Sequence, residues 1–292
     1  MGAAHPESPA RLQAINDQLL ASGLGDCLLH VDAPLASREH LERVHDPRYV
    51  SAIESLSPRD GSIHLDPDTV MNPHTLTAAL RAAGAAVLAT DMVVGSAAEN
   101  AFCSIRPPGH HAERARAMGF CIFNNVAVAA AHALEHHRLK RVAIVDFDVH
   151  HGNGTENICC DDERVLMVST FQHPFYPYSG IAGRSERMVN IPLAAGSDGK
   201  RFREAVATHW LPALERFKPE MVFVSAGFDA HRDDDMAMLQ LADADYVWVT
   251  QQVKAIADRY AHGRIVSLLE GGYELRALGR CVVAHLRVLS GL

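Results

Sequence analysis

The sequence predicts an α/β fold in which helices cover both faces of a mostly parallel sheet. Short apolar runs typical of buried strands alternate along the chain with longer segments of helical spacing. This alternation favours right-handed crossovers between parallel strands. A chain of 292 residues with 48% hydrophobic content can also bury a substantial core, so we expect one large domain and not two small ones.

Helices are expected in the N-terminal third of the chain. Pro9 stands where a first helical turn tolerates proline, with Ser8 before it as a cap. The apolar residues that follow at helical spacing are Leu12, Ile15, Leu19 and Leu20. Asp46 and Pro47 begin a second, short helix in the same way. An alanine-rich helix is expected over about 73–94.

The rest of the chain alternates between strands and helices. Strands are expected near 100–105, 142–148, 164–170, 220–226 and 264–269. Helices are expected near 124–137, 200–216, 243–261 and 275–289. Long loops remain at 106–121 and 171–187. Loops of this length inside a compact domain are usually functional.

Composition and charge exclude several classes of partner and compartment. The formal net charge of −8 argues against nonspecific nucleic-acid binding, which needs clustered lysine and arginine. The segment before Arg11 has no apolar signal-peptide core, and charges interrupt the longest apolar stretches. We therefore expect a cytoplasmic protein without a membrane span. The six cysteines show no C-x-x-C spacing, and most of them are expected to be small buried residues.

The most informative feature is the sequence Asp-Phe-Asp-Val-His-His at 146–151, which directly follows the apolar run 142–145. Side chains alternate along an extended strand, so Asp146, Asp148 and His150 share one face. The following Gly-Asn-Gly-Thr is a turn sequence that marks the carboxyl edge of a sheet, where ligands bind in open α/β folds. A strand end that carries only solvated polar groups is the alternative interpretation.

Three other predicted strands are also followed by polar residues. The strand near 100–105 leads into Arg-Pro-Pro-Gly-His-His at 106–111, that near 220–226 into Asp229, and that near 264–269 into Glu-Gly-Gly-Tyr at 270–273. Because the carboxyl ends of parallel strands meet at one edge, we expect one site there.

Two carboxylates and one imidazole predict a catalytic metal site with room for water and substrate. The predicted ligands of a zinc-like ion are Asp148, His150 and Asp229. Hydrolysis also needs a base, an acid and a donor to the developing oxyanion. The predicted residues for these roles are His110, His111 and Tyr273. A single Asp-x-His set argues against a two-metal site of the arginase kind.

The chain resembles the histone deacetylase-like zinc amidohydrolases of the class II type, a superfamily with acetoin utilisation proteins and acetylpolyamine amidohydrolases. The motifs that carry the resemblance are HPESPARL at 5–12, RPPGHHAE at 106–113, GFCIFNN at 119–125, VDFDVHHGNGT at 145–155, HPFYPYSG at 173–180, SAGFDAHRDD at 225–234 and LEGGY at 269–273. The resemblance implies a three-layer αβα arginase/deacetylase-like fold with a central mostly parallel sheet. It also implies a single catalytic domain over residues 1–292.

The resemblance implies roles for these residues. The family's zinc ligands fall on Asp148, His150 and Asp229, and its histidine pair falls on His110 and His111. His111 would be the general base and acid. Asp146 would orient His110, and Asn153 would orient His111; asparagine at this position is a class II mark. Tyr273 matches the tyrosine that hydrogen-bonds the substrate carbonyl.

The resemblance further implies a tunnel for an acyl-lysine side chain and a second ion. The tunnel residues would be Phe120 and Tyr176 as walls, with Gly119 and Gly271 beside them. Core packing is the alternative for the two aromatic residues. A potassium ion would lie beneath the zinc, held by Asp146, Asp148, His150, Ser169 and Thr170.

The sequence favours an acyl-lysine peptide or protein as substrate. Arg114 and Arg116 follow the histidine pair and, at the tunnel mouth, would repel a polycation. A small acetylated amine such as an acetylpolyamine is the alternative substrate. A non-catalytic acyl-lysine reader is the alternative from another class and would lack a metal ligand or the tyrosine. A homo-oligomer is compatible with the sequence.

Overall fold

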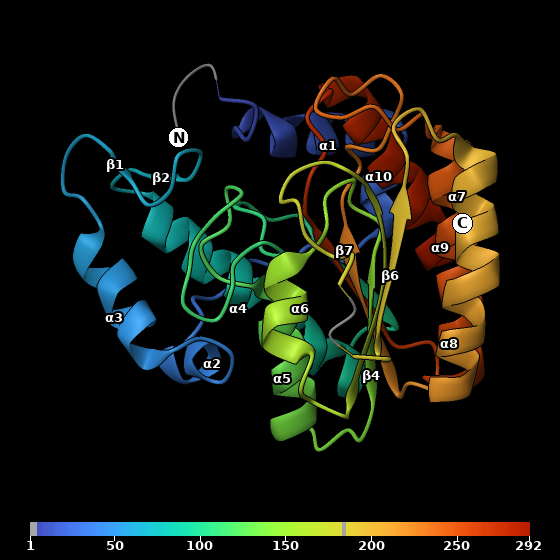
Figure 1. Cartoon of the computed structure of the whole chain (residues 1–292), viewed down its shortest axis with the longest axis horizontal. Coiled ribbons are helices and arrows are strands. Elements are labelled where there is room, and N and C mark those ends of the chain that lie inside the picture. Colours follow the sequence, from blue (N-terminus) through green and yellow to red (C-terminus); the bar gives the residue numbers. More distant parts are fainter. Residues whose placement is uncertain (1–4, 183–184) are drawn as a thin grey trace.

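A six-stranded parallel sheet lies at the centre of the computed structural model, which describes residues 5–182 and 185–292 (Figure 1). Its strands are β3 (Asn100–Cys103), β4 (Val142–Asp146), β5 (Val165–Gln172), β6 (Met188–Leu193), β7 (Met221–Ala226) and β8 (Ile265–Leu269). They lie in the order β3-β8-β7-β4-β5-β6, and every neighbouring pair is parallel. All six carboxyl ends therefore share one edge of the sheet.

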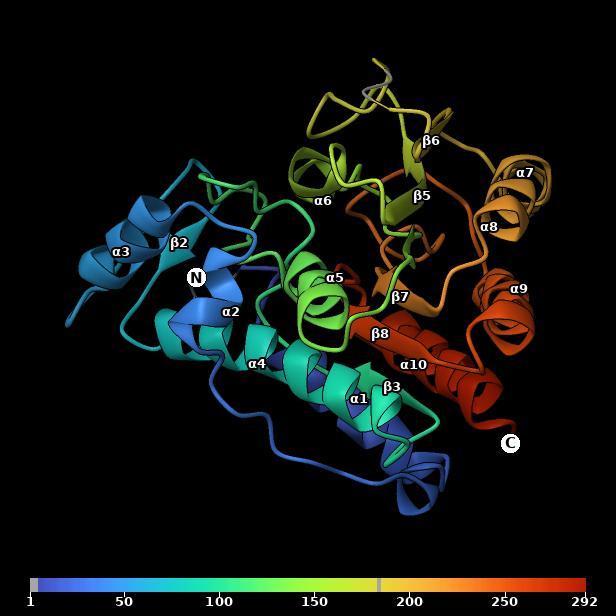
Figure 2. The same cartoon turned by 90° about the horizontal axis from the view of Figure 1, so that it is seen from below.

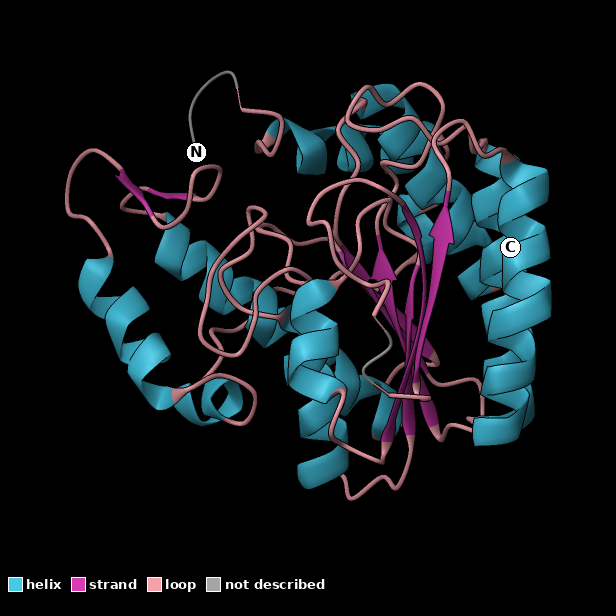
Figure 3. Ribbon diagram, in the orientation of Figure 1, coloured by secondary structure: helices cyan, strands magenta, loops and turns pink. Residues whose placement is uncertain are grey.

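Helices cover both faces of this sheet, which confirms the predicted three-layer α/β arrangement (Figures 2 and 3). Helices α4 (Thr75–Val94), α5 (Asn125–Glu135) and α6 (Asn153–Cys159) pack on one face. Helices α8 (Leu211–Phe217), α9 (Asp243–Tyr260) and α10 (Leu275–Ser290) pack on the other, and α1 (Ala10–Ala21) lies against α10. The remaining elements are α2 (Arg38–Glu42), α3 (Pro47–Leu56), α7 (Gly199–Ala205), two short helical segments (Gly25–Cys27 and Val206–Trp210), and the antiparallel pair β1 (Ile63–His64) and β2 (Val70–Met71).

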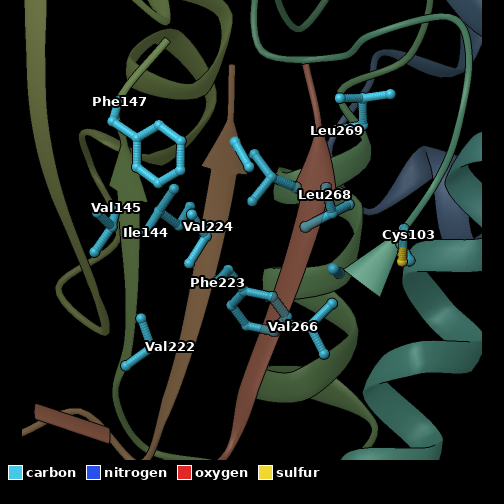
Figure 4. Close-up of a cluster of buried hydrophobic side chains, with 14 of the residues drawn as sticks. Cys103, Ile144, Val145, Phe147, Val222, Phe223, Val224, Val266, Leu268 and Leu269 are labelled. Carbon is cyan, nitrogen blue, oxygen red and sulfur yellow. The ribbon is translucent and has the colours of Figure 1, made fainter. Parts of the chain in front are cut away.

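The centre of the sheet is apolar on both faces. Every residue of β4, β7 and β8 is buried, as expected for parallel strands covered by two helical layers. Figure 4 shows side chains of these three strands in contact, including Ile144, Val224 and Leu268. This packing fixes the strand ends, and with them the loops that carry the polar residues.

Two details of the predicted elements were wrong, and one apolar residue of the first helix is exposed. Strand β4 ends at Asp146, two residues early, because the side chain of Asp146 accepts a hydrogen bond from the Asp148 amide (3.1 Å) and turns the chain. Ser8 does not cap α1 with its side chain; its carbonyl accepts from the Arg11 amide instead. Leu20 is 72% exposed, whereas Ile15 and Leu19 are buried.

Helix α4 is the one helix of the described residues that is long and apolar enough to cross a membrane. Half of its apolar stretch is buried inside the protein, and the helix packs against α5, β3 and β8. The sequence argument that charges interrupt the longest apolar stretches does not exclude this helix, because the helix is apolar enough even though it contains Arg81 and Asp91. Its packing is that of a core helix.

Candidate metal centre

The loops after four adjacent strands, β3, β8, β7 and β4, meet at the carboxyl edge of the sheet. They carry the residues that the sequence singled out: His110 and His111 after β3, Asp148 and His150 after β4, Asp229 after β7, and Tyr273 after β8. These segments are far apart in the chain. The strand order is what brings them together.

Asp148, His150 and Asp229 form a compact, buried group of possible metal ligands. One donor atom from each lies within 4.8 Å of the others. Nδ1 of His150 is 3.0 Å from Oδ1 of Asp148 and 3.3 Å from Oδ2 of Asp229. Oδ2 of Asp229 is buried and accepts no well-aligned hydrogen bond from the described residues. Two buried carboxylates need a positive charge between them, so the group fits a divalent ion such as zinc.

The electrostatics of this group also favour a cation. Although burial lowers it, the neighbouring carboxylates of Asp148 and Asp229 raise the pKa of His150 to about 9. Burial and the nearby charge of Asp148 raise the pKa of Asp229 to about 6. Ionisation of one carboxylate therefore raises the free-energy cost of ionising the other, unless a cation lies between them.

Gly271 gives the backbone room to reach the two carboxylates. Its N–H donates to Oδ2 of Asp148 (2.8 Å), and a Cβ at this position would lie 2.0 Å from Oδ2 of Asp229. A side chain here would have to displace a metal-binding carboxylate. The glycine is thus required by close approach, not by the turn alone.

The two adjacent histidines have opposite environments. Nδ1 of His110 is 3.0 Å from Oδ2 of Asp146, and its Nε2 is 3.7 Å from Oδ1 of Asp148. Although burial opposes it, these carboxylates raise the pKa of His110 well above its usual range. We infer that its imidazole is cationic at neutral pH.

His111 is held as a neutral base by an amide. Its Nδ1 lies 2.8 Å from Oδ1 of Asn153, whose amide nitrogen donates to Glu113 (2.9 Å) and is thereby fixed in orientation. Nδ1 therefore carries the proton, and Nε2 has a lone pair. Burial and the charges of His110 and His150 lower the pKa of His111 well below its usual range.

Two contacts position Tyr273: a hydrogen bond from its backbone amide and a cation–π contact on one face of its ring. Its N–H donates to Oδ2 of Asp234 (2.6 Å), and the guanidinium of Arg11 lies 4.9 Å from its ring centroid. Burial raises the pKa of the phenol well above 10, so it keeps its proton and can act as a hydrogen-bond donor. Asp234 also accepts a hydrogen bond from the Glu274 amide (3.0 Å), so it fixes the backbone on which Tyr273 stands.

A cavity of about 230 Å³ opens above the metal-binding group. The predicted tunnel residues Gly119, Phe120, Tyr176 and Gly271 line it, together with His110, His111, His150 and Tyr273. The ring of Tyr176 meets His111 edge to face at 5.3 Å, and Phe120 meets Tyr273 in the same way at 6.1 Å. The cavity is narrow, aromatic at its sides and polar at its floor.

Five residues of the cavity and its support were not predicted from the sequence. Phe175 stacks on the His150 ring (5.4 Å), and Pro108, Met236 and the partly exposed Asp68 complete the lining. Buried Glu270 accepts hydrogen bonds from the Gly109 and His110 amides (2.6 and 3.1 Å) and so fixes the histidine loop. Glu270 directly follows a strand, and this signal could have identified it.

Arg114 and Arg116, the two arginines after the histidine pair, do not lie at the mouth of the cavity as the sequence argument required. Arg114 donates to the Ile158 carbonyl (3.3 Å), and Arg116 lies 3.7 Å from Asp66. Neither lines the cavity, whereas the carboxylate of Asp68 does. The predicted repulsion of a polycation therefore has no structural basis.

Three of the predicted potassium residues, Asp146, Ser169 and Thr170, lie on the neighbouring strands β4 and β5, and Asp148 and His150 lie in the loop after β4. Asp146 of β4 pairs with Ser169 of β5, and Thr170 follows. Oγ of Ser169 is buried and has no hydrogen-bond partner among the described residues. An unpaired buried oxygen beside a carboxylate fits an oxygen-coordinated cation.

The whole described chain resembles proteins of one family. The histone deacetylase domain model matches residues 5–289. A histone deacetylase-like amidohydrolase of Pseudomonas aeruginosa is 39% identical over 99% of this chain and 78% of its own length. The polyamine deacetylase HDAC10 of Homo sapiens is 37% identical over 98% of this chain and 44% of its own length. The crystal structure of the HDA15 HD domain has a TM-score of 0.92 and 34% identity, covering 100% of this chain and 85% of that chain.

Proposed function

The chain belongs to the histone deacetylase family and is a hydrolytic deacetylase, and from this premise we propose that it is zinc-dependent and removes acetyl or other acyl groups from lysine side chains of peptides or proteins. The observation that carries the proposal is the narrow aromatic cavity with Asp148, His150 and Asp229 at its floor. We also propose that residues 1–292 form one catalytic domain that acts in the cytoplasm, without nucleic-acid or membrane partners.

Asp148, His150 and Asp229 would hold the zinc ion. When bound, zinc would polarise the substrate carbonyl and lower the pKa of a water molecule. The lone pair at Nε2 of His111 accepts the proton of the attacking water, because Asn153 holds the other ring proton in place. The same imidazolium then donates that proton to the leaving amine.

Tyr273 stabilises the negative charge that develops on the substrate carbonyl oxygen, and His110 controls the protonation state of His111. The phenol of Tyr273 keeps its proton and donates to the oxyanion formed at the substrate carbonyl. His110, held by Asp146, keeps a positive charge next to His111 and so keeps His111 neutral before the reaction. Two adjacent histidines thus have distinct tasks set by their hydrogen-bond partners.

The walls of the cavity suit the stem of an acylated lysine. Phe120, Phe175 and Tyr176 enclose the cavity with rings, and Met236 adds an apolar side chain. Acylation removes the positive charge of the lysine amine, so its four methylene groups can enter this environment without desolvating an ammonium ion. A narrow apolar wall also keeps bulk water away from the reacting amide.

We further propose a potassium ion beneath the zinc, held by Asp146, Asp148 and His150 with Ser169 and Thr170. The support is the side-chain oxygen of Ser169, which has no hydrogen-bond partner among the described residues, and the pairing of Ser169 with Asp146 on the next strand. Bound there, such an ion would offset the negative charge of the buried acids.

The proposal is tested by turnover of the zinc-loaded protein on acetyl-lysine peptides and N-acetylpolyamines side by side. Peptides are expected to be cleaved faster. Tyr273→Phe should bind zinc and lose about two to three orders of magnitude in rate, because one oxyanion donor is gone. Asp229→Ala should lose both zinc and activity. Rates like the wild type in either variant would contradict these roles.

Acetylpolyamine deacetylation is a second candidate, and Asp68 favours it. This carboxylate lines the cavity and could bind a distant ammonium group. Burial and Asp66 raise its pKa to about 6, so its charge is complete only above that pH. If polyamines are the substrate, Asp68→Asn should raise KM for them more than for a neutral peptide. Absence of turnover on both substrate classes would instead support an acyl-lysine reader.

A further inference from the structure

A second group of possible metal ligands lies far from the candidate metal centre. It consists of Asp91, in the last turn of α4, and His132, His136 and His137, at the end of α5. One donor atom from each lies within 4.8 Å of the others. Because α5 ends just before β4 begins, the cluster lies at the amino edge of the sheet, opposite the carboxyl edge that carries the catalytic residues (Figure 1).

The donor atoms of this cluster already converge. Oδ1 of Asp91 lies 2.7 Å from Nε2 of His132 and 2.7 Å from Nε2 of His137. The ring of His136 stacks on that of His132, with centroids 4.8 Å apart and an angle of 9° between the planes. One carboxylate oxygen thus faces two imidazole nitrogens, with a third imidazole beside them. Helices α4 and α5 run side by side and hold this arrangement (Figure 2).

We propose that Asp91, His132, His136 and His137 form a second metal site, for a divalent transition ion that prefers imidazole ligands, such as Zn²⁺, Co²⁺ or Ni²⁺. Four protein ligands make a closed site, which is typical of structural and not catalytic ions. In a tetrahedral site with bonds of about 2.0 Å, neighbouring donor atoms lie about 3.3 Å apart. The 2.7 Å contacts would have to open by about half an ångström, which side-chain rotation can provide.

The site is accessible from solvent. The side chain of Asp91 is 43% exposed, that of His137 is 18% exposed, and His136 is an exposed residue. His132 is buried and anchors the cluster to α5. An ion can therefore reach the donor atoms without any opening of the fold.

Arg43 opposes metal binding at this site. Its Nη1 donates to Nδ1 of His132 (2.9 Å), so Nδ1 is an acceptor and the ring proton is on Nε2, the atom that faces Asp91. To bind a metal ion through Nε2, the His132 ring must lose the proton on Nε2 and carry its proton on Nδ1 instead. A protonated Nδ1 can no longer accept the hydrogen bond from Arg43, so Arg43 disfavours this change. Its positive charge also repels a cation. Arg43 is bound to Glu39 (2.7 Å) and partly exposed, so it can turn away.

The test is isothermal titration calorimetry with Zn²⁺ at pH 7.5, on protein whose site at Asp148, His150 and Asp229 is already loaded with zinc. The wild type is expected to bind one more equivalent. The double variant His136→Ala/His137→Ala should bind that equivalent at least tenfold more weakly, with unchanged deacetylase activity. Arg43→Met, which removes the donor and the charge, should bind it about tenfold more tightly. His209→Gln, at an exposed histidine of another helix, is the matched control and should behave as the wild type.

Asp229→Ala separates this site from the catalytic one. That variant should lose the catalytic ion and still bind one equivalent of Zn²⁺ with the affinity of the second site. The proposal is overturned if the wild type binds no further equivalent. It is equally overturned if the double variant keeps the wild-type affinity, or if Arg43→Met weakens binding.

Discussion

At the level of single residues, hydrogen-bond partners decide what identical side chains do. His110 and His111 are neighbours in the chain and both are buried. Asp146 beside the first raises its pKa, whereas the neutral Asn153 beside the second adds no compensating charge. An acid–base pair with separated pKa values is the arrangement that general acid–base catalysis requires. The separation follows from the residues at 146 and 153, which face the two rings.

Gly271→Ala is expected to abolish zinc binding without unfolding the protein. The added Cβ would lie 2.0 Å from Oδ2 of Asp229 and 2.6 Å from Oδ2 of Asp148, so both carboxylates must move. Zinc content after dialysis should fall by at least tenfold, while the far-ultraviolet circular dichroism spectrum stays the same. The matched control is Gly25→Ala, where the nearest atoms to the added Cβ would lie 3.7 Å away, an ordinary contact distance. Normal zinc content in Gly271→Ala would show that the carboxylates tolerate the displacement.

The sequence was a good guide to which residues meet and a poor guide to which loop residues line the cavity. Alternation along a strand placed Asp146, Asp148 and His150 on one side even though β4 ends at the first of them. The choice between Phe175 and Tyr176 depends on how the loop turns after β5, which no periodicity encodes; both line the cavity.

The second metal cluster shows the same limit. The i, i+4 spacing of His132 and His136 puts both on one helix face, and this signal was available from the sequence. Asp91 comes from another helix, and only the packing of α4 on α5 brings it to the histidines. Pairings between helices therefore required the three-dimensional structure.

Among the elements, α4 is positioned by a single glycine. A Cβ on Gly84 would lie 2.0 Å from the carbonyl oxygen of Pro34, in the segment that covers the helix. The Ala36 amide donates to the Leu80 carbonyl beside it (2.9 Å), so this segment follows the helix closely. At Gly84, the backbone of α4 is in direct contact with the backbone of Pro34 and Ala36.

Gly84→Ala should therefore destabilise the protein, although alanine favours helices by roughly 0.5–1 kcal/mol over glycine. Overpacking against backbone typically costs about 1–3 kcal/mol. Urea unfolding should report the loss in the free energy of unfolding. Gly279→Ala in α10, where the nearest atom would lie 2.9 Å away, should lose less. Equal losses in both variants would contradict the argument from close approach.

Long elements were predicted well and short or marginal ones were missed. The strands and helices with continuous apolar runs or clear helical spacing appear within a few residues of their expected bounds. Strand β6 was missed because it lies at the sheet edge, contains Pro192 and is only partly buried. Helix α2 has five residues, too few for a periodic pattern.

For the whole molecule, two buried histidines make stability depend on pH. Burial lowers the pKa of His45 to about 4 and that of His285 to about 3. Unfolded histidines titrate near 6.5, so between pH 6.5 and 4 the unfolded state binds more protons than the folded state. The free energy of unfolding should therefore fall as pH decreases, by about 1 kcal/mol per pH unit for each histidine.

Urea unfolding of the wild type and of His285→Gln between pH 7 and 5 measures this contribution. Glutamine does not titrate and can still hydrogen-bond Thr250 and Ser267, which contact the imidazole at 2.7 and 2.9 Å. The variant should lose stability less steeply on acidification, by about 1 kcal/mol per pH unit. Identical slopes for the two proteins would mean that His285 is not buried as a neutral ring.

The contact between Arg11 and the loop after β8 has a consequence for biosynthesis. Arg11, in the first helix, donates to the carbonyl of Gly272 (2.6 Å) and lies over the ring of Tyr273, and α1 packs against α10. A nascent chain on the ribosome makes Arg11 early and Tyr273 some 260 residues later. Until that late segment emerges, the polypeptide has neither the loop that Arg11 contacts nor α10, the partner of its first helix. The first helix can therefore take its final position only after the last strand and the last helix have been synthesised.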